Sequence, residues 1–274
     1  MKRSCIAGAV LTSVLAGSAM AADLPAKAPE MPLKAPVPQV VSDWTGFYIG
    51  VHGGHGWARP STTDFDLNQS NPRLDEMELP LHAPRLRGAV LGGHAGYNWQ
   101  WGQRGVVGLE IDYSAANIKK TQAVIDDLTD CCQFFDKRTL AAKLDALASA
   151  RARAGVLVGP QLLLYGTGGA AWGHTKFTDT IAFVSLVDPS QNTIDVSRAS
   201  ANHFGWVAGA GAEWKLWDTG LMLRVEYLHY DFGSASLAFD TNHSGRTQFK
   251  GESFNLPLDR LTTDVVRGGV SYKF

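Results

Sequence analysis

The sequence predicts an all-β protein, an eight-stranded antiparallel up-and-down transmembrane β-barrel with short periplasmic turns and four long outer loops. Three observations lead to this prediction. The chain opens with a segment typical of a secretory leader, apolar and polar residues alternate from Trp44 onward, and short and long connections follow one another strictly. We therefore expect a signal peptide over residues 1–21, a Pro-rich periplasmic linker over 22–43 and an outer-membrane barrel over 44–274.

The first residues form the expected signal peptide. Lys2 and Arg3 precede an apolar stretch that ends in the small-residue tripeptide Ala19-Met20-Ala21. A basic start, a short apolar core and an Ala-x-Ala site are typical of a cleaved leader. The stretch is shorter than the roughly 20 apolar residues of a membrane-spanning helix. We expect cleavage after Ala21.

Residues 22–43 form the expected linker. They contain five prolines spaced by Ala, Lys and Val. Such spacing favours an extended polyproline conformation over a packed core. A disordered N-terminus without a partner is the alternative interpretation.

Eight segments with period-two alternation follow, which is typical of strands with two unlike faces. In the first, Phe47 and Ile49 lie on one face while Tyr48 and His52 lie on the other. Two of the eight carry Gly on both faces and alternate less cleanly. The predicted strands cover residues 44–58, 87–101, 105–117, 143–157, 161–176, 203–216, 221–232 and 262–274.

The connections between these segments indicate a membrane barrel. Three are tight turns at Gly102-Gln103-Arg104, Gly159-Pro160 and Asp218-Thr219-Gly220. The other four are long and largely polar, over residues 59–86, 118–142, 177–202 and 233–261. Outer-membrane barrels have short periplasmic turns and long outer loops. An even strand number also places both chain ends on the periplasmic side.

The charged face of these strands is predicted to line the lumen, and the apolar face to contact lipid. Eight strands leave an interior wide enough only for side chains, where mixed charges can pair. A girdle of Trp and Tyr is expected near the strand ends. The predicted girdle is Trp99, Trp101, Tyr113, Tyr165, Trp172, Trp214, Trp217, Tyr227 and Tyr272. The predicted lumen charges are Glu110, Asp112, Asp145, Arg151, Arg153, Glu213, Lys215, Arg224, Glu226, Arg267 and Lys273.

The alternative architecture is a soluble, lipocalin-like barrel with the apolar face inside. Ala and Gly dominate the apolar face of this chain, as in Ala148, Ala150 and Ala152. Such small side chains would fill a soluble core poorly. A transmembrane barrel with its apolar face toward lipid is therefore favoured.

Composition excludes several classes of partner and site. The formal net charge of −1 gives no basic footprint for nucleic acid. Cys131 and Cys132 are the only cysteines after the leader, and sequence neighbours do not fit ordinary disulfide geometry. The Gly-rich stretches continue the strand alternation and open no helix, so they do not form nucleotide loops. No cofactor is predicted.

No catalytic or metal site is predicted either. His52 and His94 fall on inward faces of adjacent strands, and no inward-facing serine is expected close to both, although Ser149 could be near them in space. The His and Cys spacings do not match a zinc site. A histidine in an outer loop, at His82, His203 or His243, could bind haem, although a solvated loop histidine is the ordinary interpretation.

Four motifs together resemble a known family. They are Trp44-Thr45-Gly46-Phe47-Tyr48-Ile49-Gly50, Leu164-Tyr165-Gly166-Thr167-Gly168-Gly169-Ala170-Ala171-Trp172-Gly173, Arg224-Val225-Glu226-Tyr227-Leu228-His229-Tyr230-Asp231 and Val270-Ser271-Tyr272-Lys273-Phe274. They are similar to the alphaproteobacterial small outer-membrane barrels of the porin-family or outer-membrane immunogenic protein type. The resemblance implies insertion by the outer-membrane assembly machinery, with Val270, Tyr272 and Phe274 as the assembly signal.

These observations predict a non-enzymatic protein of the cell outer membrane of a Gram-negative bacterium. Its expected role is structural and surface-presenting, with a lumen closed by mixed charges. The alternatives are a narrow porin for small solutes, capture of haem or another ligand by the outer loops, and a lipid-modifying enzyme. The expected partners are outer-membrane lipid, lipopolysaccharide and the barrel assembly machinery.

Overall fold

The computed structural model describes residues 43–61, 85–127, 134–185, 188, 190, 192–216, 219–242, 253–258 and 260–274. The predicted signal peptide, the linker up to residue 42 and Cys131-Cys132 lie outside these residues, as do Trp217, His82 and His243. Among the described residues, no helix is long and apolar enough to cross a membrane.

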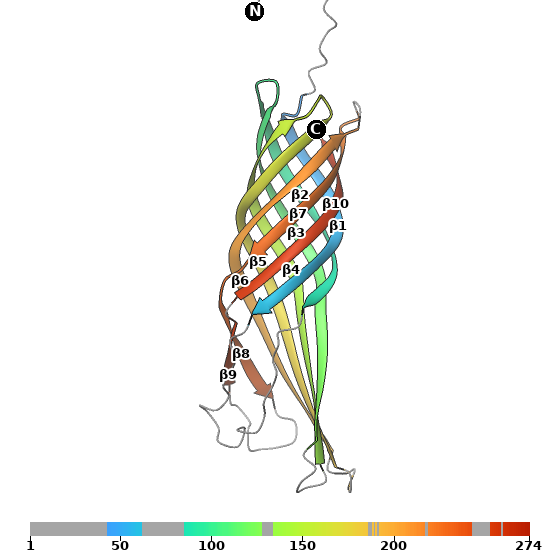
Figure 1. Ribbon diagram of the computed structural model, residues 1–274, viewed down its shortest axis with the longest axis vertical. Coiled ribbons are helices and arrows are strands. Elements are labelled where there is room, and N and C mark those ends of the chain that lie inside the picture. The colour runs from blue at the N-terminus through green and yellow to red at the C-terminus, as the bar shows by residue number, and fades with distance from the viewer. Residues whose placement is uncertain are drawn as a thin grey trace, which may run out of the picture. The chain divides into compact units, whose positions relative to one another are not determined.

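Eight strands close into a barrel (Figure 1). Neighbouring strands pair antiparallel, β1 pairs with β10, and the pairing of β5 with β6 completes the ring. The eight-stranded antiparallel barrel predicted from the sequence is therefore confirmed. Its strands are β1 (Gly46–Ser61), β2 (Leu86–Trp101), β3 (Gly105–Asp127), β4 (Phe134–Leu157), β5 (Leu162–Ser185), β6 (Thr193–Lys215), β7 (Leu221–Asp231) and β10 (Arg260–Lys273).

Three tight turns lie at one end of the barrel, which we call the turn end. They connect β2 to β3, β4 to β5 and β6 to β7, as predicted. Gly102, Gly159 and Gly220 adopt φ values of 63°, 86° and 75° in these turns. Residues with a Cβ rarely adopt this left-handed region, so glycine is required there. The opposite end, where the longer connections lie, is called the loop end.

Two of the predicted long loops consist mostly of strand. β3, β4, β5 and β6 have 23 or 24 residues each and continue past the barrel as a paired sheet (Figure 1). A third connection contains β8 (Ala235–Asn242) and β9 (Ser253–Leu258), and β8 pairs with β6. The polar composition of these segments suggested loops, but the four extensions pair in the order β3, β4, β5, β6, which satisfies their backbone groups along the shared edges.

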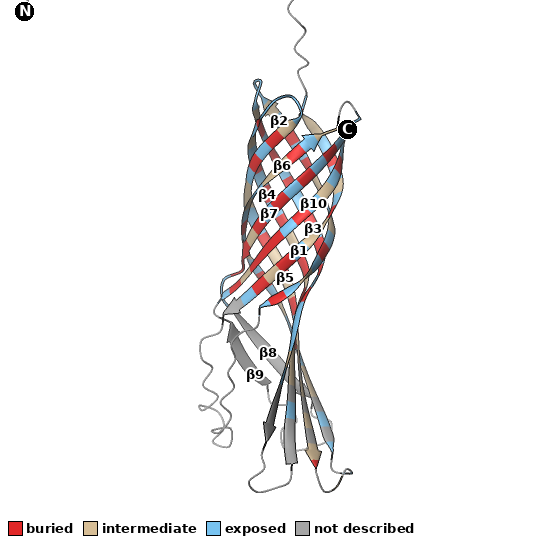
Figure 2. Cartoon of the chain, turned by 45° about the vertical axis from the view of Figure 1, so that its right-hand side comes forward, coloured by how far each residue is buried: buried red, intermediate tan, exposed pale blue. Residues whose placement is uncertain are grey.

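Burial alternates along the barrel strands (Figure 2). In β7, Leu223 and Val225 are exposed on the outside, whereas Arg224 and Glu226 are buried inside. The inverted arrangement predicted from the sequence is therefore present. Tyr165 is an exception to the predicted aromatic girdle, because it points into the barrel and is 5% exposed.

Apolar side chains fill both ends of the lumen. At the turn end, the cluster consists of Trp44, Tyr48, Val106, Leu157, Leu163, Tyr165 and Met222. The Trp44 side chain is fully buried, and its backbone N–H donates to Gln100 Oε1 at 2.8 Å. At the loop end, a larger cluster includes Ile118, Leu144, Leu228, Tyr230 and Phe232. These two clusters enclose the polar middle of the barrel.

The interior of this narrow barrel requires glycine at particular positions, which gives a first prediction. A Cβ on Gly54 would lie 2.1 Å from the carbonyl oxygen of Val266, whereas a Cβ on the adjacent Gly53 would meet its nearest atom, on Leu91, at 3.5 Å. Gly54→Ala should therefore lower the free energy of unfolding by about 1 to 3 kcal/mol through overpacking. Gly53→Ala is the matched control and should change it little. Urea unfolding of the two variants checks this, and equal stabilities would contradict it.

Candidate functional site: the charged lumen

Eight charged side chains fill the middle of the lumen between the two apolar clusters. They come from β3, β4, β6, β7 and β10, where they alternate with residues that point outward. Each of them is 6% exposed or less. The set, called the lumen network below, comprises Glu110, Asp112, Glu213, Glu226, Arg151, Arg153, Arg224 and Arg267.

Glu110 lies at the centre of the lumen network. Arg151 Nη2 donates to its Oε1 at 2.5 Å, and Arg224 Nη2 donates to its Oε2 at 2.5 Å. The Tyr48 hydroxyl donates to Oε2 at 2.6 Å. Arg153 Nη1 also donates to Oε2 at 3.4 Å, so three arginines and a tyrosine meet at one carboxylate.

Glu213 holds the turn-end side of the network. It accepts hydrogen bonds from Arg153 Nη2 at 2.6 Å and from Arg224 Nε at 3.0 Å. Arg224 therefore bridges Glu110 and Glu213. The guanidinium of Arg153 also lies 4.0 Å from the centre of the Tyr165 ring, a cation–π distance.

Glu226 and Asp112 hold the other side. Glu226 accepts from Arg151 Nη1 at 2.9 Å and forms an ion pair with Arg267 Nη2 at 2.7 Å. Arg267 Nη1 also donates to Asp112 Oδ1 at 2.9 Å, and the Ser149 hydroxyl donates to Asp112 Oδ2. The contacts thus run continuously from Glu213 to Asp112.

Four carboxylates balance four guanidinium groups in this network. Burying a charge is costly unless it is paired and hydrogen-bonded, and each of these groups has at least one partner of opposite charge. The side chains of the network reach across the lumen between strands that do not pair, as from Arg151 on β4 to Glu226 on β7. The arrangement can brace the wall and block a water-filled path.

A histidine pair adjoins the lumen network. The Nδ1 atoms of His52 and His94 lie 3.1 Å apart, and each Nε2 lies 2.8 Å from a serine hydroxyl, Ser114 for His52 and Ser271 for His94. Each histidine thus has a serine of its own, whereas Ser149 bonds to Asp112 instead. The side chains of the two histidines and of their own two serines are 4% exposed or less, so no substrate can reach them in this conformation.

Three predicted lumen charges lie outside the network. Asp145 is a correction: it lies at a β-bulge between Leu144 and Ala146, and it contacts His174 and Lys176 rather than the lumen. The bulge adds one residue and reverses the alternation, so Leu144 points inward instead. Lys215 and Lys273 lie at the turn end, where both approach Asp43.

The sequence assigns Tyr48 to the inward face, but the roles of Tyr48, Tyr165 and Trp44 in filling the lumen were not predicted. Tyr48 and Tyr165 share the inward face with the charges, and this alternation could have identified them. Trp44 precedes β1 in the structure, and the alternation that places Tyr48 inward also places Trp44 on that face, where it is fully buried. His203, expected in an outer loop, lies inside β6, is 2% exposed, and has Nε2 2.7 Å from the Thr175 hydroxyl.

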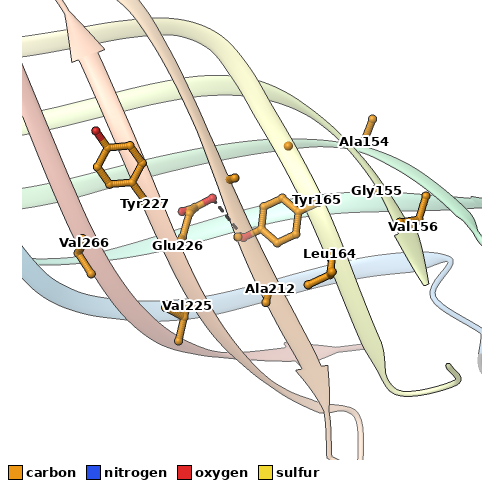
Figure 3. Close-up of a pocket in the computed structure, with 13 residues that line it drawn as sticks. Ala154, Gly155, Val156, Leu164, Tyr165, Ala212, Val225, Glu226, Tyr227 and Val266 are labelled. Atoms are coloured by element: carbon orange, nitrogen blue, oxygen red, sulfur yellow. Dashed lines mark hydrogen bonds between the residues drawn. The ribbon is translucent and has the colours of Figure 1, made fainter. Parts of the chain in front are cut away.

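The outer wall carries shallow apolar grooves. One crosses β4, β5, β6 and β7 at small side chains such as Ala154 and Ala212 (Figure 3). Among its lining residues, Tyr165 donates a hydrogen bond to Glu226 at 3.2 Å. Within the described parts of the chain, no group of three His, Cys, Asp or Glu side chains could hold a metal ion.

Comparisons with known proteins agree with this architecture. A family model described as an outer membrane protein beta-barrel domain matches residues 8–274. The 31 kDa outer-membrane immunogenic protein of Brucella melitensis is 30% identical over 270 residues, covering 97% of this chain and 98% of the relative. The 22 kDa outer membrane protein of Rhizobium leguminosarum is 28% identical over 213 residues, covering 78% and 75%.

Among solved structures, Neisserial surface protein A aligns with 84% of this chain and 98% of its own. The TM-score is 0.39 and the sequence identity is 12%. The Ail protein of Yersinia pestis aligns with 84% of this chain and 99% of its own, with a TM-score of 0.37 and 15% identity.

Proposed function

Because the chain belongs to the outer membrane protein β-barrel family, we propose that it is a closed barrel with a structural and surface-presenting role. Its place is the outer membrane, as for the relatives it matches. In that membrane the turn end is periplasmic and the loop end faces outward.

The observation that carries the proposal is the filled lumen. A porin needs a continuous wet path, and wide lumens of this kind occur in barrels of 16 or more strands. Here the turn-end cluster, the lumen network and the loop-end cluster succeed one another along the axis. Because these three layers of side chains fill the lumen, a structural role is favoured over a narrow porin.

The surface-presenting part of the proposal rests on the extended strands. A tilted strand crosses a bilayer with about 9 to 11 residues, yet β3, β4, β5 and β6 have more than twice that number. The excess forms a sheet beyond the loop end (Figure 1). The name of the Brucella relatives, immunogenic proteins, supports an exposed surface of this kind.

An enzymatic role gains little support from the geometry. The histidine pair and its serines are the best candidate for catalysis, and their side chains are almost fully buried inside the barrel. His203 does not support haem capture by outer-loop histidines, because its side chain is buried inside the barrel.

Planar-bilayer conductance of the folded full-length protein tests the proposal. We expect no stable single-channel steps, because the lumen network and the apolar clusters leave no path for hydrated ions. The heat-dependent gel shift of a folded barrel, measured on the same sample, verifies that folded protein was tested. A porin of known conductance, added to the same bilayer, verifies its sensitivity. Reproducible steps that depend on the protein would overturn the closed-barrel proposal and favour the porin.

A further inference from the structure

A row of four cations crosses the outside of the barrel near the loop end. Arg87 on β2 opposes Lys119 on β3, Lys119 opposes Lys143 on β4, and Lys143 opposes Lys176 on β5. The four residues, called the cation row below, are therefore direct cross-strand neighbours on consecutive strands.

The cation row points away from the lumen. Each member follows or precedes an inward residue that is almost fully buried, such as Leu86 before Arg87, Ile118 before Lys119 and Thr175 before Lys176. Because side chains alternate along a strand, the cations lie on the outer face. Arg87, Lys119 and Lys176 are exposed there.

Like charges directly opposite each other destabilise a sheet. Lys176 has a partner, since its Nζ lies 2.6 Å from Asp145. Among the residues that the structure describes, no ion pair neutralises Arg87, Lys119 or Lys143. Arg59 and Arg85 add further positive charge, because they line one pocket with Arg87, His55 and Trp57. This concentration of cations indicates an anionic ligand.

The position of the cation row along the barrel axis indicates which class of anion it binds. On β2, the outward residues between Arg87 and the turn end run from Ala89 to Trp99, which matches the length that crosses the hydrocarbon core. On β3, the outward Leu109, Ile111 and Tyr113 are exposed over the same span. The cation row therefore lies at the outer interface, where lipid headgroups carry their phosphates.

An apolar groove lies on the turn-end side of the row. It runs over β1, β2 and β3 where the outward residues Gly93 and Ala95 are small, and the larger Ile49, Leu91 and Ile111 flank it. A groove of this kind can accommodate an acyl chain. The groove and the row share strands β2 and β3, where Arg87 and Lys119 lie at the headgroup level above it. This pairing fits an amphipathic anion better than a free ion.

We propose that the cation row binds the phosphate groups of a phosphorylated glycolipid in the outer leaflet, with one acyl chain in the β1–β3 groove. Arg87 supplies a planar, two-pronged donor, and Lys119 and Lys143 supply point charges. The bound phosphate replaces like-charge repulsion between the strands with attraction. The row covers β2 to β5 only, so the lipid is held on one side of the barrel.

The test uses the full-length protein in phosphatidylcholine nanodiscs that contain equal amounts of diphosphorylated lipid A and its dephosphorylated form. Native mass spectrometry after release from the nanodisc measures which lipid stays bound. We expect the wild-type protein to retain the phosphorylated form preferentially. The variant R87Q/K119Q should reduce that preference on the order of tenfold.

The variant R104Q/K137Q is the matched control, because it removes the same charge at the turn end and on the extension of β4. It should retain lipid like the wild type, and the heat-dependent gel shift verifies that both variants are folded. Equal retention by R87Q/K119Q, or equal binding of the two lipid forms, would overturn the proposal. Displacement of the lipid by millimolar inorganic phosphate would assign the row to free phosphate and overturn the lipid assignment. Neither variant should alter conductance, so this test is independent of the closed lumen.

Discussion

Replacing Glu110 by Gln is expected to lower the free energy of unfolding of the barrel by about 3 to 5 kcal/mol. Glu110 accepts hydrogen bonds from Arg151, Arg224 and Tyr48, and its side chain is 2% exposed. The amide keeps the shape but removes the charge, which leaves four guanidinium groups against three carboxylates. Urea unfolding in lipid vesicles, followed by tryptophan fluorescence, measures the change.

Two further variants distinguish the effect of an unbalanced buried charge from a loss of stability that any carboxylate substitution would cause. Asp145→Asn removes a carboxylate of the neighbouring strand β4 that lies outside the lumen network, and it should lower the free energy of unfolding by less than about 1 kcal/mol. E110Q/R224M restores the balance of charges, and it should be more stable than E110Q alone. A Glu110→Gln protein as stable as Asp145→Asn would contradict the view that the lumen network braces the barrel.

Replacing Phe274 by Ala is expected to lower the amount of barrel in the outer membrane severalfold without destabilising barrels that do assemble. The Phe274 side chain is 70% exposed, and it contacts Tyr272 at a ring distance of 5.2 Å. The backbone N–H of Phe274 donates to the Phe47 carbonyl at 3.0 Å, and this bond survives the substitution. We therefore expect the side chain to matter for recognition by the assembly machinery rather than for the stability of the folded barrel.

Phe204→Ala is the matched control, because Phe204 is equally exposed at 75% on the outer face but lies far from the C-terminus. Quantitative blotting of outer-membrane fractions compares the two variants, and periplasmic levels show that secretion is intact. Normal outer-membrane levels of Phe274→Ala would contradict the role of Val270, Tyr272 and Phe274 as an assembly signal.

The eight strands could be predicted because local sequence determines them. Alternation such as Phe47, Tyr48, Ile49 assigns each residue to a face before any partner strand is known, and the turn glycines separate the segments. The extensions of β3 to β6 could not be predicted in this way. Polar strands that are solvated on both faces look like loops until their pairing is known.

The lumen network was partly predictable for the same reason. Alternation assigns Glu110, Arg151 and Arg224 to the inward face, but it does not say which of them meet. Asp145 was misplaced because a bulge reverses the alternation without a sequence signal. The Ser114 contact of His52 and the cation row depend on the register between strands, which a single sequence does not fix.

Exchange of the arginine guanidinium protons with water distinguishes a closed lumen from a water-filled one. In NMR spectra of the ¹⁵N-arginine-labelled barrel in micelles, Arg151, Arg153, Arg224 and Arg267 should exchange slowly, because their side chains are 2% exposed or less. The exposed Arg87 and Arg104 are internal references and should exchange fast. If the four lumen arginines exchange as fast as the references, water fills the lumen and the barrel is not closed.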